Sequence, residues 1–168
     1  GLLSTVENLI IDEKVEATHT TPDPFEINEL LSKMVNAGCT YAFMEVSSHA
    51  IDQDRIYRLN YDGRLFTNIT HEHLDYHGDF KAYIQAKKKF FDSSEKDSFA
   101  LVNADDRNGR IMVQNAKASV KTYALKSMAD YRAKIIENDF SGLHLLIDGH
   151  EVHFRLIGRF NAYNLLAV

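Results

Sequence analysis

Residues 71–77, HEHLDYH, place three imidazoles and two carboxylates within seven positions. Side chains of these types are the common protein ligands of divalent metal ions, and such a density of them is unusual. Glu45 is a second candidate, because it follows the apolar stretch YAFM, where a carboxylate needs a partner. Glu45 could bind a metal or act as a general base, although an acidic residue that caps the next element would give the same pattern.

The 71–77 stretch is similar to the HxHxDH run of binuclear zinc hydrolases of the metallo-β-lactamase type. Tyr76 separates Asp75 from His77, however, which breaks the adjacency that this run requires, and no further histidine clusters follow at clear spacing. We expect only one or two of the three histidines to be ligands. A metal-dependent hydrolase that uses the His71–His77 cluster is therefore one hypothesis, and a polar loop with incidental histidines is another.

Lys87 occupies an unusual place in the helix predicted over residues 80–92. At about 100° per residue, Phe80, Ile84 and Phe91 share one apolar face of this helix. Lys87 projects from the middle of that face, whereas Lys88 lies at its border. An ammonium group held there costs several kcal/mol unless it is paired.

Three outcomes are open for the amine of Lys87. It can extend to solvent at the edge of the apolar face, it can pair with Glu45 or Asp75, or burial can lower its pKa and leave a neutral amine. A neutral amine can take up carbon dioxide as a carbamate. The side chain would then carry a negative charge and could hold a cation bound nearby.

The elements predicted around these residues alternate between strand and helix. Apolar runs at residues 41–46, 64–69 and 99–103 are each followed by polar residues, and the first is apolar on both alternating faces, as in a strand covered on both sides. We therefore predict an α/β fold: an open, mostly parallel sheet with helices on both faces and polar clusters at the carboxyl edge. Three helices are predicted, each capped by an aspartate. The first begins at Pro24 and ends before Gly38, the second covers residues 80–92, and the third covers residues 107–118.

After Ser119 the pattern changes to strict alternation. Apolar residues alternate up to Ile147 and again after Val152, and Asp148-Gly149 between them is a hairpin signal. Residues 131–136 could supply a further strand. We predict a small antiparallel sheet over residues 119–157, appended to the α/β core.

The composition fits one globular domain. The chain has 168 residues, and 45% of them are hydrophobic, which excludes disordered and collagen-like proteins. Its net charge of −5 disfavours a nucleic-acid-binding surface. No apolar run is long enough for a transmembrane helix, and no signal peptide opens the chain. With the single Cys39 this predicts a cytoplasmic protein. Because the chain begins without Met and stops in an apolar helical pattern, we expect residues 1–168 to be one domain excised from a longer protein.

Seven motifs occur in order: TTPD at 20–23, MEVSSHA at 44–50, FTN at 66–68, HLDYHG at 73–78, AK at 86–87, NADD at 103–106 and GRFNAYN at 158–164. Together they resemble the central domain of the Mur ligase family. The resemblance runs along the whole chain, and the MEVSSHA and HLDYHG motifs point to the UDP-N-acetylmuramoyl-tripeptide synthetase branch of this family.

The resemblance implies an ATP-dependent amide ligase of peptidoglycan precursor synthesis, in cell wall biogenesis. In the family, ATP phosphorylates the carboxylate of UDP-MurNAc-L-Ala-D-Glu, and the amine of a diamino acid attacks the acyl phosphate. The implied cofactor is Mg²⁺, with ATP as a substrate. The implied partners are these small molecules, with no nucleic acid and no membrane, and we expect a monomer.

The family's Gly-rich phosphate-binding loop ending GKT does not occur in these residues. Its N-terminal UDP-binding domain and its C-terminal domain, which recognises the diamino acid, are also outside them. The 168 residues alone are therefore expected to be inactive.

The resemblance also assigns roles by position. Glu45, His73 and Lys87 match the catalytic metal site, with Lys87 as a carbamate. The residues that match contacts to the UDP-sugar are Thr20, Thr21, Ser47, Gln53 and Arg55. Asn161 and Asn164 match the family's adenine-side asparagines. His19 stands where some relatives have asparagine and receives no role.

Three alternatives stay open on the residues alone. The first is another Mur-type ligase, such as MurF, folylpolyglutamate synthetase or cyanophycin synthetase. The second is the metal-dependent hydrolase described above. The third is a non-catalytic binding module in which Lys87 simply extends to solvent.

Overall fold

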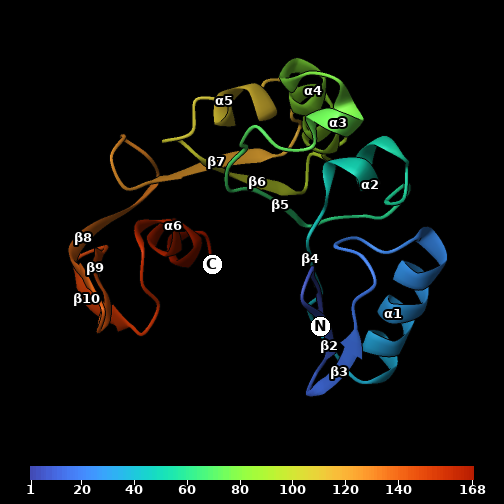
Figure 1. The fold of residues 1–168 in the computed structure, drawn as a ribbon, viewed down its shortest axis with the longest axis horizontal. Helices are drawn as coiled ribbons and strands as arrows, with labels where there is room; N and C mark the ends of the chain where they lie inside the picture. Colours follow the sequence, from blue (N-terminus) through green and yellow to red (C-terminus); the bar gives the residue numbers. More distant parts are fainter. The chain divides into compact units, whose positions relative to one another are not determined.

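Four short strands and two helices form the first of two compact units, Gly1–Asn60. The computed structural model describes all 168 residues (Figure 1). The strands β1 (Leu2–Leu3), β2 (Glu7–Ile10), β3 (Glu13–Glu16) and β4 (Phe43–Met44) lie in the order β3-β2-β1-β4. β4 pairs parallel with β1, and the other neighbours pair antiparallel.

Helix α1 (Pro24–Asn36) forms as its sequence predicts. The side chain of Asp23 accepts hydrogen bonds from the backbone N–H groups of Phe25, at 2.8 Å, and Glu26, at 3.0 Å, which satisfies two of the donors that open a helix. The helix ends before Gly38, whose φ of 87° suits glycine. Its apolar face packs on the sheet in a core formed by Leu3, Ile10, Ile27, Leu30 and Met34.

The strand predicted over residues 41–46 is shorter and less covered than expected. Only Phe43–Met44 is a strand, and the side chains of Tyr41 and Phe43 are 74% and 66% exposed. The prediction of a strand buried on both faces is therefore wrong for β4 within this unit. The physical reason is its place at the edge of the sheet, where β1 is its single neighbour.

The second unit, Tyr61–Val168, contains a six-stranded sheet in the order β10-β9-β8-β7-β6-β5. β5 (Gly63–Phe66), β6 (Phe99–Asn103) and β7 (Ser119–Ala124) pair parallel, and β7 pairs parallel with the start of β8 (Tyr131–Asp139). Two hairpins add β9 (Gly142–Ile147) and β10 (His150–Phe154) antiparallel. The mostly parallel α/β sheet is confirmed, and the strand direction reverses after β8 rather than from residue 119.

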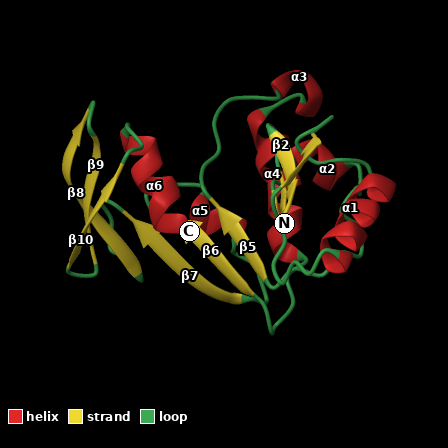
Figure 2. Ribbon diagram, turned by 90° about the horizontal axis from the view of Figure 1, so that it is seen from below, coloured by secondary structure: helices red, strands yellow, loops and turns green.

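Helices cover both faces of this sheet. In Figure 1, α4 (Phe80–Asp92) and α5 (Gly109–Met112) lie on one face, and α6 (Arg159–Ala167) lies on the other. Figure 2 shows α6 beside the β7–β9 region, where Ala162 packs on Leu143 and Leu145. The remaining short helices are α2 (Ser48–Asp52) in the first unit and α3 (Leu74–His77) in the second. None of these helices is both long and apolar enough to cross a membrane.

The helix predicted over residues 107–118 is reduced to the single turn of α5. Asp106 does not cap it, because its carboxylate accepts hydrogen bonds from the backbone N–H of Asn108, at 2.8 Å, and from its side-chain amide, at 3.0 Å, and so forms a local turn. The predicted cap at Asp79 and hairpin turn at Asp148-Gly149 are both confirmed. Asp79 accepts from the N–H of Ala82, and both turn residues have positive φ.

Candidate functional site

Glu45 follows β4 directly and is held by Thr5. The Oε2 atom of Glu45 accepts a hydrogen bond from the Thr5 hydroxyl at 2.5 Å and another from the Thr5 backbone N–H at 3.1 Å. The Thr5 hydroxyl also lies 3.1 Å from that of Thr20. Glu45 caps no helix in these contacts, since both hydrogen bonds to its carboxylate come from Thr5. The sequence analysis missed Thr5, whose only signal is its place two residues after β1, the strand that pairs with β4.

A buried threonine connects the residues assigned to the UDP-sugar. The hydroxyl of Thr21, which is 1% exposed, donates to the backbone carbonyl of Glu45 at 2.8 Å and accepts from the N–H of Ser47 at 2.9 Å. Arg55 Nη1 donates to the Thr21 carbonyl at 2.9 Å, and its Nε donates to Gln53 Oε1, also at 2.9 Å. The six assigned residues of the first unit therefore share one hydrogen-bonded network: Thr20, Thr21, Glu45, Ser47, Gln53 and Arg55.

His73, His77 and Lys87 gather around one aromatic ring. Tyr83, which is 4% exposed, stacks on His77 with ring centroids 5.2 Å apart and meets His73 edge-on at 5.8 Å. Lys87 Nζ lies over the same ring, 5.6 Å from its centroid. α3 and α4 thus bring His73 and Lys87 to a shared platform, and sequence reasoning missed its centre, Tyr83. His73 has a left-handed backbone (φ 57°) with no side-chain capping bond, a strained conformation that is common at functional sites.

Lys87 is half-buried, and burial lowers the pKa of its amine, an effect that the nearby Glu72 carboxylate partly opposes. A lowered pKa increases the neutral fraction of the amine at a given pH, which is the condition for reaction with carbon dioxide. The direction of this pKa shift agrees with the third outcome described in the sequence analysis, in which burial favours a neutral amine.

The buried face of α4 differs from the predicted one in a way that involves Lys88. Lys88 is 5% exposed, whereas Lys87, which was expected in the middle of the buried face, lies at its margin. The face is rotated because Phe90 is also covered: it packs edge-on against Tyr61 at 5.0 Å, with the Arg64 guanidinium over its ring at 5.1 Å. The Lys88 ammonium is paired with Asp92, one helical turn further on, at 2.5 Å.

Replacing Asp92 with alanine is expected to destabilise the protein by about 1–3 kcal/mol, because the buried ammonium of Lys88 loses its partner. Lys88→Met removes the charge with the pair and is expected to cost less than about 1 kcal/mol. Glu29→Ala is the control: it breaks an exposed pair of the same spacing, Lys33–Glu29 in α1, and should leave the free energy of unfolding close to that of the wild type. Urea denaturation measures all three, and equal losses for Asp92→Ala and Lys88→Met would contradict the assignment.

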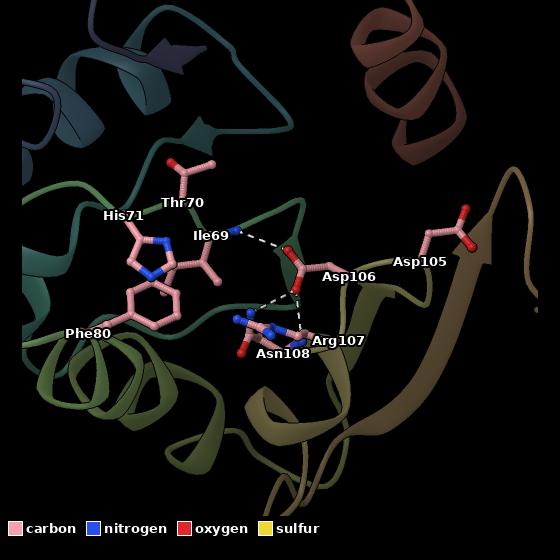
Figure 3. Close-up of a pocket in the computed structure, with 8 residues that line it drawn as sticks. All are labelled: Ile69, Thr70, His71, Phe80, Asp105, Asp106, Arg107 and Asn108. Atoms are coloured by element: carbon pink, nitrogen blue, oxygen red, sulfur yellow. Dashed lines mark hydrogen bonds between the residues drawn. The ribbon is translucent and has the colours of Figure 1, made fainter.

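A cavity of about 360 Å³ lies at the carboxyl ends of β5 and β6 (Figure 3). One wall is the ring of His71, which stacks on Phe80 with centroids 4.1 Å apart. On the opposite wall, Asp106 accepts a hydrogen bond from the backbone N–H of Ile69 at 3.2 Å. The lining residues offer imidazole, guanidinium and carboxylate groups to a polar solute: Ile69, Thr70, His71, Phe80, Asp105, Asp106, Arg107 and Asn108.

The histidines of the 71–77 stretch are divided between two rings. His71 stacks on Phe80, whereas His73 and His77 pack on Tyr83, and no group of three or more His, Cys, Asp or Glu side chains in the structure is arranged to hold a metal ion. The geometry expected of a zinc hydrolase is therefore absent from this stretch. Mg²⁺ prefers oxygen ligands and keeps several waters, and the carboxylate of Glu45 in the first unit is a group of this kind.

Asn161 and Asn164 lie on α6, and Asn161 helps to begin that helix. Its side-chain amide donates to the carbonyl of Ile157 at 2.8 Å, and its Oδ1 lies 3.4 Å from the amide nitrogen of Asn164. Tyr163, between them in sequence, donates its hydroxyl hydrogen to Asp105 Oδ2 at 2.8 Å. The sequence analysis gave no role to Tyr163 or Asp105, although both lie inside motifs that it singled out.

Comparison with known proteins decides the family. A family model described as the Mur ligase middle domain matches residues 1–168. The chain belongs to this family. The resemblance inferred from the ordered motifs is thereby confirmed, and the family is not that of the zinc hydrolases considered above.

Among curated Mur ligases, the chain is 59% identical to the UDP-N-acetylmuramoyl-L-alanyl-D-glutamate--2,6-diaminopimelate ligase of Cytophaga hutchinsonii and 56% identical to that of Parabacteroides distasonis. Both matches cover 100% of this chain and 35% of the relative, so the chain spans about a third of the length of these proteins. A solved structure of a ligase with the same name superposes with a TM-score of 0.84 at 28% identity, over 99% of this chain and 35% of that one. MurF from Acinetobacter baumannii, at 18% identity over 82% of this chain and 31% of its own, shares the fold with a TM-score of 0.69.

Proposed function

We propose that this chain is the middle domain of an ATP-dependent ligase that joins 2,6-diaminopimelate to UDP-MurNAc-L-Ala-D-Glu. The observation that carries the proposal is the match of all 168 residues, at 59% identity, to a Mur ligase named for this reaction. The names of the relatives also favour diaminopimelate over lysine as the diamino acid.

The proposed reaction has two steps. The dipeptide carboxylate attacks the γ-phosphorus of ATP and forms an acyl phosphate, with ADP as the leaving group. The amine of the diamino acid then attacks the acyl carbon, inorganic phosphate leaves, and the amine loses a proton as the amide bond forms. Mg²⁺ held by the proposed metal ligands would neutralise charge on the transferred phosphoryl group.

The two units supply different groups for this reaction. The hydrogen-bonded network around Thr21 supports the proposed contacts of Ser47, Gln53 and Arg55 with the UDP-sugar. It holds the backbone N–H of Ser47 and the guanidinium of Arg55, which in turn binds the side chain of Gln53. Thr5 supports the proposed metal role of Glu45 by orienting its carboxylate. The Tyr83 platform supports the proposed metal roles of His73 and of Lys87 as a carbamate.

A reconstitution experiment tests the proposal. A full-length ligase that contains this chain should release ADP and phosphate only when ATP, UDP-MurNAc-L-Ala-D-Glu and 2,6-diaminopimelate are all present. Lysine in place of diaminopimelate is the specificity control. The 168-residue chain alone should be inactive, because it contains no Gly-rich loop ending GKT to cradle the phosphates. Turnover by the 168-residue chain, or none by the full-length protein, would overturn the proposal.

A further inference from the structure

Asp105, in the loop after β6, accepts four hydrogen bonds. Its Oδ2 accepts from the backbone N–H groups of Leu125 and Lys126, both at 2.9 Å, and its Oδ1 accepts from the N–H of Ser127 at 2.8 Å. The fourth donor is the hydroxyl of Tyr163 in α6, at 2.8 Å. One carboxylate therefore ties together the end of β6, the loop after β7 and the last helix. In Figure 3 it points away from Asp106.

The carboxyl group of Asp105 is ionised at neutral pH. Burial by itself would raise the pKa of this carboxyl, but the hydrogen bonds from Ser127, Tyr163 and the loop backbone outweigh burial and hold the pKa well below its usual range. Burial, together with the carboxylate, raises the pKa of Tyr163 to about 12. At neutral pH the pair is thus a phenol that donates to an anion, which is among the stronger hydrogen bonds in proteins.

Tyr163 determines how α6 is turned about its own axis. Successive residues of a helix are about 100° apart, so Asn161 and Asn164 share one side of α6 and Tyr163 lies on another. The helix begins weakly, because Gly158 at its N-terminus provides no side-chain cap. With Tyr163 fixed to Asp105, the two asparagine amides are presented on a defined side of the helix.

We propose that Asp105 and Tyr163 are positioning residues that aim Asn161 and Asn164 at the base of the bound nucleotide. The inference rests on the proposed function, since it takes ATP as the ligand of these asparagines. Neither Asp105 nor Tyr163 touches the reacting atoms. Their loss should therefore weaken nucleotide binding and leave the chemical step largely intact.

The test compares three variants of the full-length ligase. Tyr163→Phe removes the single bond that links α6 to Asp105, and Asp105→Asn removes the charge that strengthens this bond. Asp130→Asn is the matched control: Asp130 accepts hydrogen bonds from the N–H and hydroxyl of Thr122, so it holds the same loop after β7 without touching α6. Steady-state kinetics with each substrate varied in turn, and equilibrium binding of ADP, are measured together with thermal unfolding.

Tyr163→Phe and Asp105→Asn are each expected to raise the KM for ATP and the dissociation constant of ADP by about fivefold to tenfold. The value of kcat and the KM for the UDP-sugar should change less than about twofold, and Asp130→Asn should leave all of these constants unchanged. A fall in kcat that follows the loss of thermal stability, with an unchanged KM for ATP, would overturn the inference and show a purely structural role. Wild-type protein that neither binds ADP nor turns over would overturn the proposed function itself, and the inference with it.

Discussion

Lys87→Ala in the full-length ligase is expected to lower kcat by about 10²–10³-fold, the range found when one preorganised electrostatic group is removed from an active site. The structure explains why this lysine is special. Its amine lies over Tyr83, the ring that His73 also contacts, and burial lowers the pKa of the amine, so a larger fraction is neutral and can form a carbamate. Alanine can neither form that anion nor replace it.

The matched control for this prediction is Lys81→Ala, an exposed lysine of the same helix, which should leave kcat within about twofold. Lys87→Arg keeps a positive charge but cannot form a carbamate, so it should be as inactive as the alanine variant. Formate or acetate should restore part of the activity of Lys87→Ala. A ¹³C NMR signal from the carbamate carbon, after incubation of wild-type protein with ¹³C-bicarbonate, gives a readout independent of turnover. This signal should be absent in Lys87→Ala. Full activity of Lys87→Arg would disprove the carbamate.

Tyr123→Ala is expected to destabilise the protein by about 3–5 kcal/mol, the cost of removing a large aromatic side chain from a packed core. Tyr123 is 0% exposed and extends from β7, in the parallel part of the sheet. Its hydroxyl is 3.5 Å from the backbone carbonyl of Phe66, at the end of β5. Alanine would leave a cavity beneath the strand ends that carry the pocket and the Asp105 loop.

Tyr123→Phe separates the two parts of this effect, because it keeps the ring and removes only the long hydrogen bond. We expect it to cost about 1 kcal/mol. Urea denaturation followed by circular dichroism measures both variants. If Tyr123→Ala lost no more stability than Tyr123→Phe, the side chain would not fill the core as the structure shows.

Local signals in the sequence predicted the elements well where one residue decides the backbone. Asp23 and Asp79 begin α1 and α4 because their carboxylates satisfy N–H groups a few residues away, and Asp148-Gly149 turns the hairpin because both residues accept positive φ. The prediction that Asp106 caps a helix was wrong, because its carboxylate can form either a helix cap or a local turn. In the structure it forms the turn, in which it accepts hydrogen bonds from Asn108.

The burial of individual side chains was harder to predict than the positions of helices and strands. Projection of α4 placed Lys87 in the buried face and Lys88 at its border, and the structure reverses their order. A projection uses one helix alone, whereas the buried face depends on what packs against it, here Tyr61 and Arg64 on Phe90. The exposed edge strand β4 differs from its prediction for the same reason, since an apolar run does not specify its neighbours.

The sequence by itself determined the family, through seven ordered motifs, and it determined the helix starts and hairpin turn that depend on neighbouring residues. Only the tertiary structure decided which side chains support the candidate site residues. Thr5 meets Glu45 across 40 positions of the chain, and Tyr163 meets Asp105 across 58. Hydrogen bonds of this kind depend on how strands and helices are packed, because nothing in the local sequence of either partner specifies the other.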